Sequence, residues 1–384
     1  MRRADEAERR QLGELFAALC AIESPFGRER ACADRVAAEL RALGLEVEED
    51  DAGPLAGSDA GNLFARIPSR DERAGAPAGP AIVLCAHLDT VPLTAPVEPV
   101  LVDGRWENRH EAILGADNKA AVAVILAVAR RAVAEPPPVA LELLFTVCEE
   151  NALAGAKAFD VGRLRSAFGF VFDHATPIGE VVVASPTYHR VVADFHGLAA
   201  HAGLEPERGR SAIAAAAKAI AAMPLGRIDA ETTANVGAIA GGAGVNVVPA
   251  ACRVEAEARS IDDAKVEAIV AELVDHLHDG ANAAECDVDV IVEPLFRGYR
   301  VRPSAPQLAV AEAALQACGH VPRRIASGGG SDANALIAAG FPCLNLANGT
   351  ERAHRSDERV AVAALDQMLD VALALVEESA VALC

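Results

Sequence analysis

A histidine and an aspartate lie two positions apart directly after an apolar run, in "AIVLCAHLDTVP" at residues 81–92. In an extended strand, residues two apart point to the same side, so His87 and Asp89 would emerge together. Ligands of open parallel sheets bind at the carboxyl ends of the strands, which is where this pair would lie. Taken alone, the pair fits either a metal site or an ordinary helix cap, turn or satisfied polar pair.

Four further segments place the same kinds of side chain at predicted strand ends. Asp117 begins a predicted helix in "ILGADNKAAVAVIL", where a plain helix cap is the alternative explanation. Glu149 and Glu150 follow the apolar run "LELLFTVC", although adjacent glutamates are usually solvated surface charge. Asp173 follows "FGFVF", and His354 lies a few residues beyond "FPCLNLA". Five strand ends therefore deliver two histidines and several carboxylates to one edge of a sheet.

So many like charges at one packed edge would repel each other strongly, and burial would increase the repulsion. Divalent cations remove this problem. Imidazole and carboxylate ligands suit zinc, with cobalt or manganese as substitutes. The set is large enough for two metals that share a carboxylate, an arrangement that activates water against an amide or ester.

The elements that must position these residues follow two patterns. Up to about residue 185, continuous apolar runs alternate with helical stretches such as 118–134, which predicts parallel strands covered on both faces. The next hundred residues predict the order β, α, β, β, α, β of a ferredoxin-like sheet, and the first pattern then resumes. The second domain is thus inserted into the first, with expected boundaries of 1–186, 187–295 and 296–384.

Composition limits the class of protein. The chain has 384 residues, 52% of them hydrophobic, which is enough for two cores, and its formal charge of -20 argues against nucleic acid or anionic membrane as a partner. The nine cysteines include no CxxC pair and fit a reducing cytoplasm. The N-terminal segment does not resemble a signal peptide, and the longest apolar run, at 120–129, is too short for a membrane span. We therefore expect a cytoplasmic protein.

Six segments together resemble one family over nearly the whole chain. They are "CAHLDTVP", "ILGADNKAAVA", "TVCEENALAGAKAFD", "AAHAGLEPERGRSAI", "GVNVVPAACRVEAEARS" and "SGGGSDAN". Their order and spacing resemble the dinuclear zinc amidohydrolases that include carboxypeptidase G, the aminoacylases and peptidase T, and the wording is most similar to the peptidase T-like branch. The resemblance implies a three-layer α/β/α zinc-peptidase catalytic domain with an inserted ferredoxin-like α+β lid and dimerisation domain.

The resemblance also implies a role for each residue at the strand ends. Glu149 would be the general base, taking a proton from the bridging water and delivering it to the leaving amine. Asp89 would hold the second nitrogen of His87 and fix its tautomer. The implied ligands of the two zinc ions are His87 and Asp173 for one, Glu150 and His354 for the other, and Asp117 as the bridge.

The resemblance predicts one unusual backbone feature, and the sequence departs from the family in two places. The family has a cis peptide bond after the bridging aspartate, which predicts a cis Asp117–Asn118 bond. The branch more often has aspartate at position 118, and Asn118 is a mild departure that leaves the ligand set intact. A second departure, "GRWENRHEAILG", carries Trp106, Arg109 and His110 where the branch is Gly-rich, and we expect it to alter the mouth of the pocket.

Four further sites have a structural and a functional explanation. By resemblance, His201 reaches an active site from the lid, in dimers that of the partner subunit, and stabilises the developing oxyanion, although it could be an ordinary turn histidine. Arg259 and Asn246 would bind a substrate carboxylate or carbonyl, or else be a strand-surface charge and a turn residue. The backbone of Gly328 and Gly329 would cradle a substrate carboxylate, or form only a flexible loop.

The sequence favours a zinc-dependent hydrolase that cleaves an amide bond in a short peptide, and a tripeptide aminopeptidase is one such enzyme. An N-acyl amino acid deacylase or a carboxypeptidase on the same scaffold is the alternative. A metal-dependent phosphoesterase and a noncatalytic binding homologue are less favoured, because few cationic groups accompany the ligands and neither a ligand nor Glu149 is lost. We expect a homodimer formed through the inserted domain.

Overall fold

The computed structural model describes residues 3–383 and divides the chain into two compact units. Unit 1 comprises Met1–Val183, Val301–Ala326 and Ser331–Cys384, and unit 2 comprises Ala184–Arg300 and Ser327–Gly330. The middle of the chain thus forms a unit of its own, as expected for an inserted domain. Within the described part of the chain, no helix combines the length and apolar character needed to cross a membrane.

Unit 1 is built on a mixed sheet whose centre is parallel. Its strands follow the order β1 (Val47–Glu49), β2 (Leu63–Ile67), β6 (Ala140–Thr146), β3 (Ala81–His87), β7 (Phe168–His174), β16 (Cys343–Ala347) and β8 (Glu180–Ser185). Strands β6, β3, β7 and β16 are parallel neighbours, whereas β1, β2 and β8 are antiparallel to theirs. Short strands β14 (Tyr299–Arg300) and β15 (Arg323–Ala326) pair with β8.

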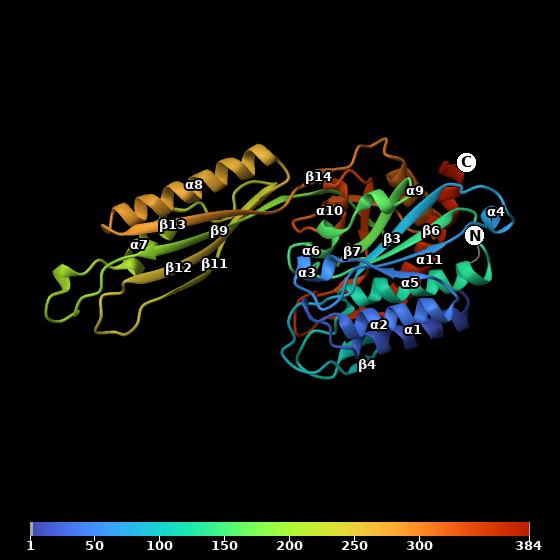
Figure 1. The fold of residues 1–384 in the computed structure, drawn as a ribbon, viewed down its shortest axis with the longest axis horizontal. Helices are drawn as coiled ribbons and strands as arrows, with labels where there is room; N and C mark the ends of the chain where they lie inside the picture. Colours follow the sequence, from blue (N-terminus) through green and yellow to red (C-terminus); the bar gives the residue numbers. More distant parts are fainter. Residues whose placement is uncertain (1–2, 384) are drawn as a thin grey trace. The chain divides into compact units, whose positions relative to one another are not determined.

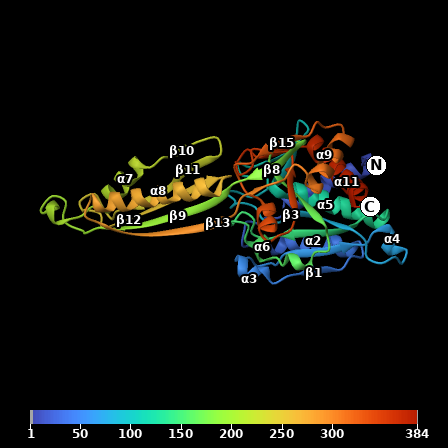
Figure 2. The same ribbon diagram turned by 90° about the horizontal axis from the view of Figure 1, so that it is seen from above.

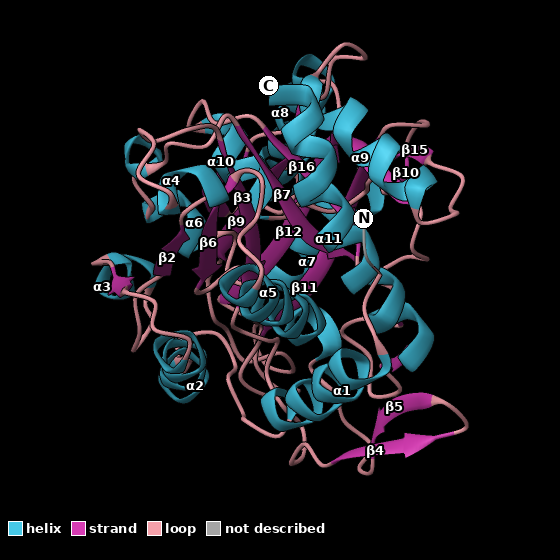
Figure 3. Ribbon diagram, turned by 90° about the vertical axis from the view of Figure 1, so that its right-hand side faces the viewer, coloured by secondary structure: helices cyan, strands magenta, loops and turns pink. Residues whose placement is uncertain are grey.

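Helices cover both faces of this sheet, because its central strands are apolar on both sides. Every residue of β3 is buried. Helices α5 (Ala116–Ala134) and α10 (Asp332–Ala338) both pack on β3 and β7, and they lie on opposite sides of the sheet in Figure 3. Helices α1 (Glu6–Cys20), α2 (Arg30–Ala42) and α11 (Val362–Leu383) pack against α5, α9 (Pro306–Ala317) against α11, and α6 (Ala154–Ala158) against α10 and α3 (Ala52–Ala56). The three-layer α/β/α architecture is confirmed.

A smaller sheet of unit 1 joins distant parts of the chain in the order β17 (Thr350–Glu351), β18 (Arg359–Ala361), β5 (Arg105–Asn108) and β4 (Pro99–Val102). All three pairings are antiparallel. Residues 359–361 pair with β5 directly before α11 begins at Val362. This sheet anchors the loop that carries His354.

Unit 2 has the predicted order of elements (Figures 1 and 2): β9 (Thr187–His196), α7 (Ala212–Ala222), β11 (Thr232–Gly241), β12 (Ala251–Ser260), α8 (Asp263–Asn282) and β13 (Asp287–Phe296). The antiparallel strands lie in the order β10 (Gly226–Arg227), β11, β12, β9, β13. Helices α7 and α8 pack on the sheet through a core separate from that of unit 1. This is the ferredoxin-like arrangement expected from the β, α, β, β, α, β pattern.

Candidate metal centre

The carboxyl ends of the parallel strands bring the strand-end residues together. His87 is the last residue of β3, Asp173 lies one residue before the end of β7, and Glu149 and Glu150 follow β6. Asp117 lies at the start of α5, and His354 lies between β17 and β18. These six residues form three overlapping groups whose potential ligand atoms lie within 4.8 Å of one another.

Asp117 occupies the centre of this arrangement. Its Oδ1 atom lies 3.7 Å from Nε2 of His87, and its Oδ2 atom lies 3.6 Å from Nε2 of His354. Nε2 of His87 is also 3.4 Å from Oδ1 of Asp173, and Nε2 of His354 is 2.8 Å from Oε1 of Glu150. The two oxygens of one carboxylate therefore face two separate histidine–carboxylate pairs, as a ligand bridging two cations must.

Glu149 belongs to the group formed with His87 and Glu150. Burial, followed by the charge of Asp173, raises the pKa of Glu149 well above its usual range. Burial likewise raises the pKa of Asp173 to about 8, although His87 opposes this rise. The pKa values of these carboxyl groups are raised because several negative charges share a buried space, a situation that bound cations would relieve.

The two histidines respond in the opposite sense. Burial lowers the pKa of His87, but Asp173, Asp117 and Asp89 together raise it well above its usual value. Hydrogen bonds to Asp117 and Glu150 raise the pKa of His354 to about 10. Burial alone would raise the pKa of Asp117, yet its hydrogen bonds with His354 and His87 lower it overall. The raised pKa values of the histidines and of most carboxyl groups thus share one cause, an excess of negative charge in a buried space that favours positive charge at the site.

Asp89 has more partners than the sequence suggested. It is fully buried, and its Oδ1 atom lies 3.3 Å from Nδ1 of His87, while its backbone oxygen lies 3.0 Å from the same nitrogen. Its two carboxylate oxygens also accept hydrogen bonds from the backbone N–H groups of Glu149 and Glu150, at 3.0 and 2.9 Å. One carboxylate therefore orients a histidine and fixes the turn that carries two glutamates.

The peptide bond between Asp117 and Asn118 is cis, as predicted. Asn118 is buried, and its Nδ2 atom lies 3.4 Å from Oδ1 of Asp173. The departure from aspartate at this position thus provides a donor to a neighbouring carboxylate. The predicted ligand set is not interrupted by it.

Sequence reasoning missed three buried carboxylates around the cluster. Glu358 accepts hydrogen bonds from the backbone of Leu114, Gly115 and Asp117. Burial raises the pKa of Glu358 to about 7, against these backbone donors, which lower it. A spacing of four residues from His354 was the only available signal in the sequence.

The other two are Asp332 and Glu29. Asp332 accepts a hydrogen bond from Oγ1 of Thr146, and burial raises its pKa to about 6. Its Oδ1 atom is buried without a hydrogen-bond partner among residues 3–383. Glu29 accepts from the backbone N–H of Cys148 at 3.0 Å. The thiol of Cys148 lies 3.2 Å from Glu29, so this cysteine is engaged away from the ligands.

The residues expected to bind substrate lie in unit 2. His201 is exposed, and its Nδ1 atom accepts a hydrogen bond from the backbone N–H of Gly203 at 3.2 Å. The backbone oxygen of Asn246 accepts from Ala202, and Val247 forms a β-bridge with His201, so the two expected residues share one tip of this unit.

Arg259 has an intramolecular carboxylate partner. Its Nη2 and Nε atoms lie 2.9 and 3.2 Å from the two oxygens of Glu257, a forked ion pair. The guanidinium also lies 4.1 Å from the centre of the Tyr188 ring, and Nη1 donates to the backbone oxygen of Gly328 at 3.4 Å. The backbone oxygen of Gly329 accepts from Ser185 at 2.9 Å. Arg259 and the glycine loop are therefore in contact, and the donor fork of Arg259 is filled by Glu257.

The 105–110 segment has a structural role that the sequence did not reveal. Trp106 packs edge-on against Phe16 of α1 with ring centroids 6.1 Å apart, and its Nε1 atom is buried without a partner in the described structure. Arg109 forms an ion pair with Glu98, and His110 lies 3.6 Å from the same carboxylate. Trp106 thus fastens the hairpin of β4 and β5 to α1.

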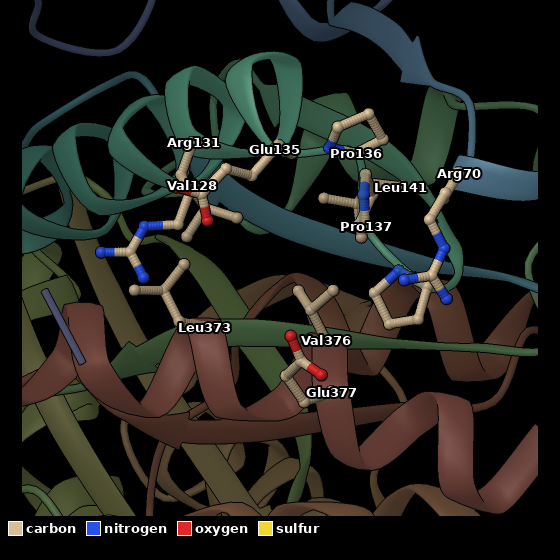
Figure 4. A pocket seen from close by; sticks show the side chains of 12 residues that line it. Arg70, Val128, Arg131, Glu135, Pro136, Pro137, Leu141, Leu373, Val376 and Glu377 are labelled. Atoms are coloured by element: carbon tan, nitrogen blue, oxygen red, sulfur yellow. The ribbon is translucent and has the colours of Figure 1, made fainter. Parts of the chain in front are cut away.

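A cavity of about 340 Å³ lies at the other end of the sheet (Figure 4). It is bordered by the end of α5, the proline run 136–138, the start of β6, α11 and Arg70 of the short helix α4 (Arg70–Arg73). Because it meets β6 at its amino end, it is separate from the ligands that follow the carboxyl ends of the strands.

Two segments of the chain match models of known protein families. Residues 185–285 match the peptidase dimerisation domain of the M20 peptidases, and residues 62–180 match peptidase family M28. The Bacillus subtilis protein YqjE is 35% identical over 372 residues, covering 97% of this chain and 99% of that protein.

Two solved structures are similar over nearly the full length. The Bacillus cereus aminopeptidase PepT has 36% identity and a TM-score of 0.84, with 96% of this chain and 98% of that chain covered. A Staphylococcus aureus tripeptidase has 32% identity and a TM-score of 0.90, with 97% and 98% covered.

Proposed function

The chain belongs to the peptidase T-like branch of the M20 metallopeptidases, and on this premise we propose that it hydrolyses an amide bond of a short peptide with two zinc ions and Glu149. The observation that carries the proposal is Asp117, whose two oxygens face the His87–Asp173 pair and the His354–Glu150 pair.

The residues present fit two divalent cations. His87 and Asp173 would hold one, Glu150 and His354 the other, and Asp117 would contribute an oxygen to each. Imidazole and carboxylate donors suit zinc, and cobalt or manganese could replace it. When bound, the two cations supply water of lowered pKa and polarise the scissile carbonyl.

Glu149 would act as the general base. It is not needed as a ligand when the other five residues bind the cations, yet it lies within the same cluster. Its carboxylate would take the proton of the attacking water and deliver it to the nitrogen of the leaving amine. Nearby cations would lower its raised pKa and so keep it deprotonated before the attack.

The inserted domain would select the substrate. His201 would stabilise the oxyanion, Asn246 would bind a carbonyl, and Arg259 with Gly328 and Gly329 would bind a carboxylate. The match of residues 185–285 to a dimerisation domain supports a homodimer formed through this domain. The similarity to an aminopeptidase and a tripeptidase favours short peptides, with N-acyl amino acids and C-terminal cleavage as the alternatives.

The test measures metal content and turnover on the same preparation. Protein purified without chelator should hold close to two zinc ions per chain and cleave members of a panel of di- and tripeptides and N-acyl amino acids. Glu149→Gln should keep the metal and lose turnover, whereas Glu46→Gln, at an exposed carboxylate, should change neither. Turnover retained in Glu149→Gln would remove this residue from the mechanism, and protein unable to take up metal would overturn the proposal.

A further inference from the structure

Glu358 contributes a buried carboxylate to the start of α5 from a distant part of the chain. Its side chain is almost fully enclosed, with the residue 2% exposed. Oε2 accepts hydrogen bonds from the backbone N–H groups of Leu114 at 2.8 Å and Gly115 at 2.7 Å. Oε1 accepts from the backbone N–H of Asp117 at 2.9 Å. Both oxygens are therefore committed to the four residues that end in the candidate bridging ligand.

The backbone N–H groups at this helix start need partners from elsewhere in the chain. The first N–H groups of a helix have no partner within the helix, and α5 departs from helical geometry at Asp117 and Asn118. Gly115, just before them, has a left-handed φ of +76°. A carboxylate is favoured at a helix start, where the unpaired N–H groups leave partial positive charge. Glu358 thus satisfies donors that the local chain cannot.

His354 lies on the same turn of the chain as Glu358. The backbone N–H of Glu358 donates to the backbone oxygen of Arg355 at 3.0 Å, and this bond closes the turn that follows His354. His354 faces Oδ2 of Asp117 with its imidazole, while Glu358 holds the backbone N–H of Asp117. The turn of residues 354–358 therefore contacts both the side chain of Asp117, through His354, and its backbone N–H, through Glu358.

We propose that Glu358 is a positioning residue for the metal centre, which sets the place of Asp117 relative to His354 and so tunes the affinity for both cations. This inference rests on the proposed function. The competing explanation is that Glu358 only stabilises the fold, as any buried carboxylate with backbone partners does.

Glu142 provides the matched control for that explanation. It is equally buried, at 1% exposed, and accepts hydrogen bonds from the backbone N–H groups of Arg165 and Ser166, each at 3.0 Å. It also pairs with Arg66 at 2.9 Å. Glu142 lies near the amino end of β6 and has no contact with the candidate ligands in the described structure. Glu142→Gln should therefore disturb a comparable set of bonds without reaching the metal centre.

The experiment compares metal binding by Glu358→Gln, Glu358→Ala, Glu142→Gln and the unchanged chain. Each full-length protein is stripped with chelator and titrated with Zn²⁺ against a chromophoric competitor, and separately with Co²⁺ while its visible spectrum is recorded. Glu358→Ala should weaken zinc binding by about 10- to 100-fold, as is usual for partners of metal ligands. Glu358→Gln should lose less, because its amide oxygen can still accept bonds. Both should change the cobalt spectrum.

Glu142→Gln should keep the zinc affinity and cobalt spectrum of the unchanged chain, even with a lower melting temperature. Glu358 variants that keep that affinity and spectrum would overturn the inference, whatever their melting temperature. If Glu358→Ala does not fold, the nearly isosteric Glu358→Gln carries the same test. No turnover is needed, so an unchanged chain that binds no metal refutes the proposed function, whereas equal binding by all variants refutes only the role of Glu358.

Discussion

Replacing Glu257 with glutamine should strengthen the binding of peptides that have a free C-terminal carboxylate. Arg259 is the residue we propose for that carboxylate, and in the structure both oxygens of Glu257 fill its fork at 2.9 and 3.2 Å. A substrate carboxylate must therefore displace Glu257 before it can use the same donors. Glutamine keeps the size of the side chain but removes its charge, so it competes less well for the guanidinium.

The structure sets the size of the effect. The side chains of Arg259 and Glu257 are 25% and 29% exposed, so solvent screens the pair and its contribution is modest. A partly exposed ion pair is worth about 1 kcal/mol or less, which corresponds to a decrease in KM of at most about fivefold. Stacking on Tyr188 should hold the guanidinium in place in the variant.

The assay compares KM for a cleaved peptide with KM for the same peptide as its C-terminal amide. Glu257→Gln should lower KM for the acid and leave that for the amide unchanged. Glu255→Gln is the matched control, because Glu255 lies on the same strand but pairs with Arg190 and Arg253. A decrease in KM of equal size for acid and amide, or an unchanged KM for the acid, would refute the reasoning.

Three further outcomes are expected. Asp89→Asn should weaken zinc binding by about 10- to 100-fold in a competition titration, because one of two carboxylate acceptors for the Glu149 and Glu150 turn is lost; unchanged affinity would limit Asp89 to a structural role. In chelated protein, the pKa of Asp173 rises from its ordinary 3.8 to about 8 on folding, so the folded state binds the extra proton in this window. The melting temperature of the chelated protein should therefore decrease as the pH is raised from about 5 to 8, and an increase would contradict this sign. Mixed His201→Ala and Glu149→Gln subunits should regain activity if His201 acts on its partner's site, and no recovery after proven subunit exchange would count against a shared site.

The gathering of the strand-end residues could be predicted because topology alone brings them together. Once "AIVLCA", "LELLFTV" and "FGFVF" are parallel neighbours, the polar residues that follow them must share an edge. The order of unit 2 was predictable for a similar reason, since each element has its own period and length. Both inferences depend on patterns within single segments.

The residues that sequence reasoning missed depend on contacts between distant segments. Glu358 binds backbone groups more than 240 positions earlier, and the letters "SDERV" around it resemble any solvated turn. In the segment "SGGGSDAN" the sequence drew attention to the backbone of the glycines, whereas the structure also buries the carboxylate of Asp332 that follows them. Trp106 was placed at the pocket mouth because its hairpin departs from the branch, and only the packing on Phe16 reveals its role.

The candidate ligands differ in how the fold holds them, and the proposed role of Glu358 rests on this difference. His87 and Asp173 lie on buried central strands, and the turn of Glu150 is fixed by Asp89. His354 instead comes from a loop, with a φ of +64° and a side chain that is 51% exposed. A ligand on such a loop is held only as well as the loop itself. Glu358 bonds that loop to the backbone of Asp117. It thereby links His354, the candidate ligand on the loop, to the residue that both cations would share.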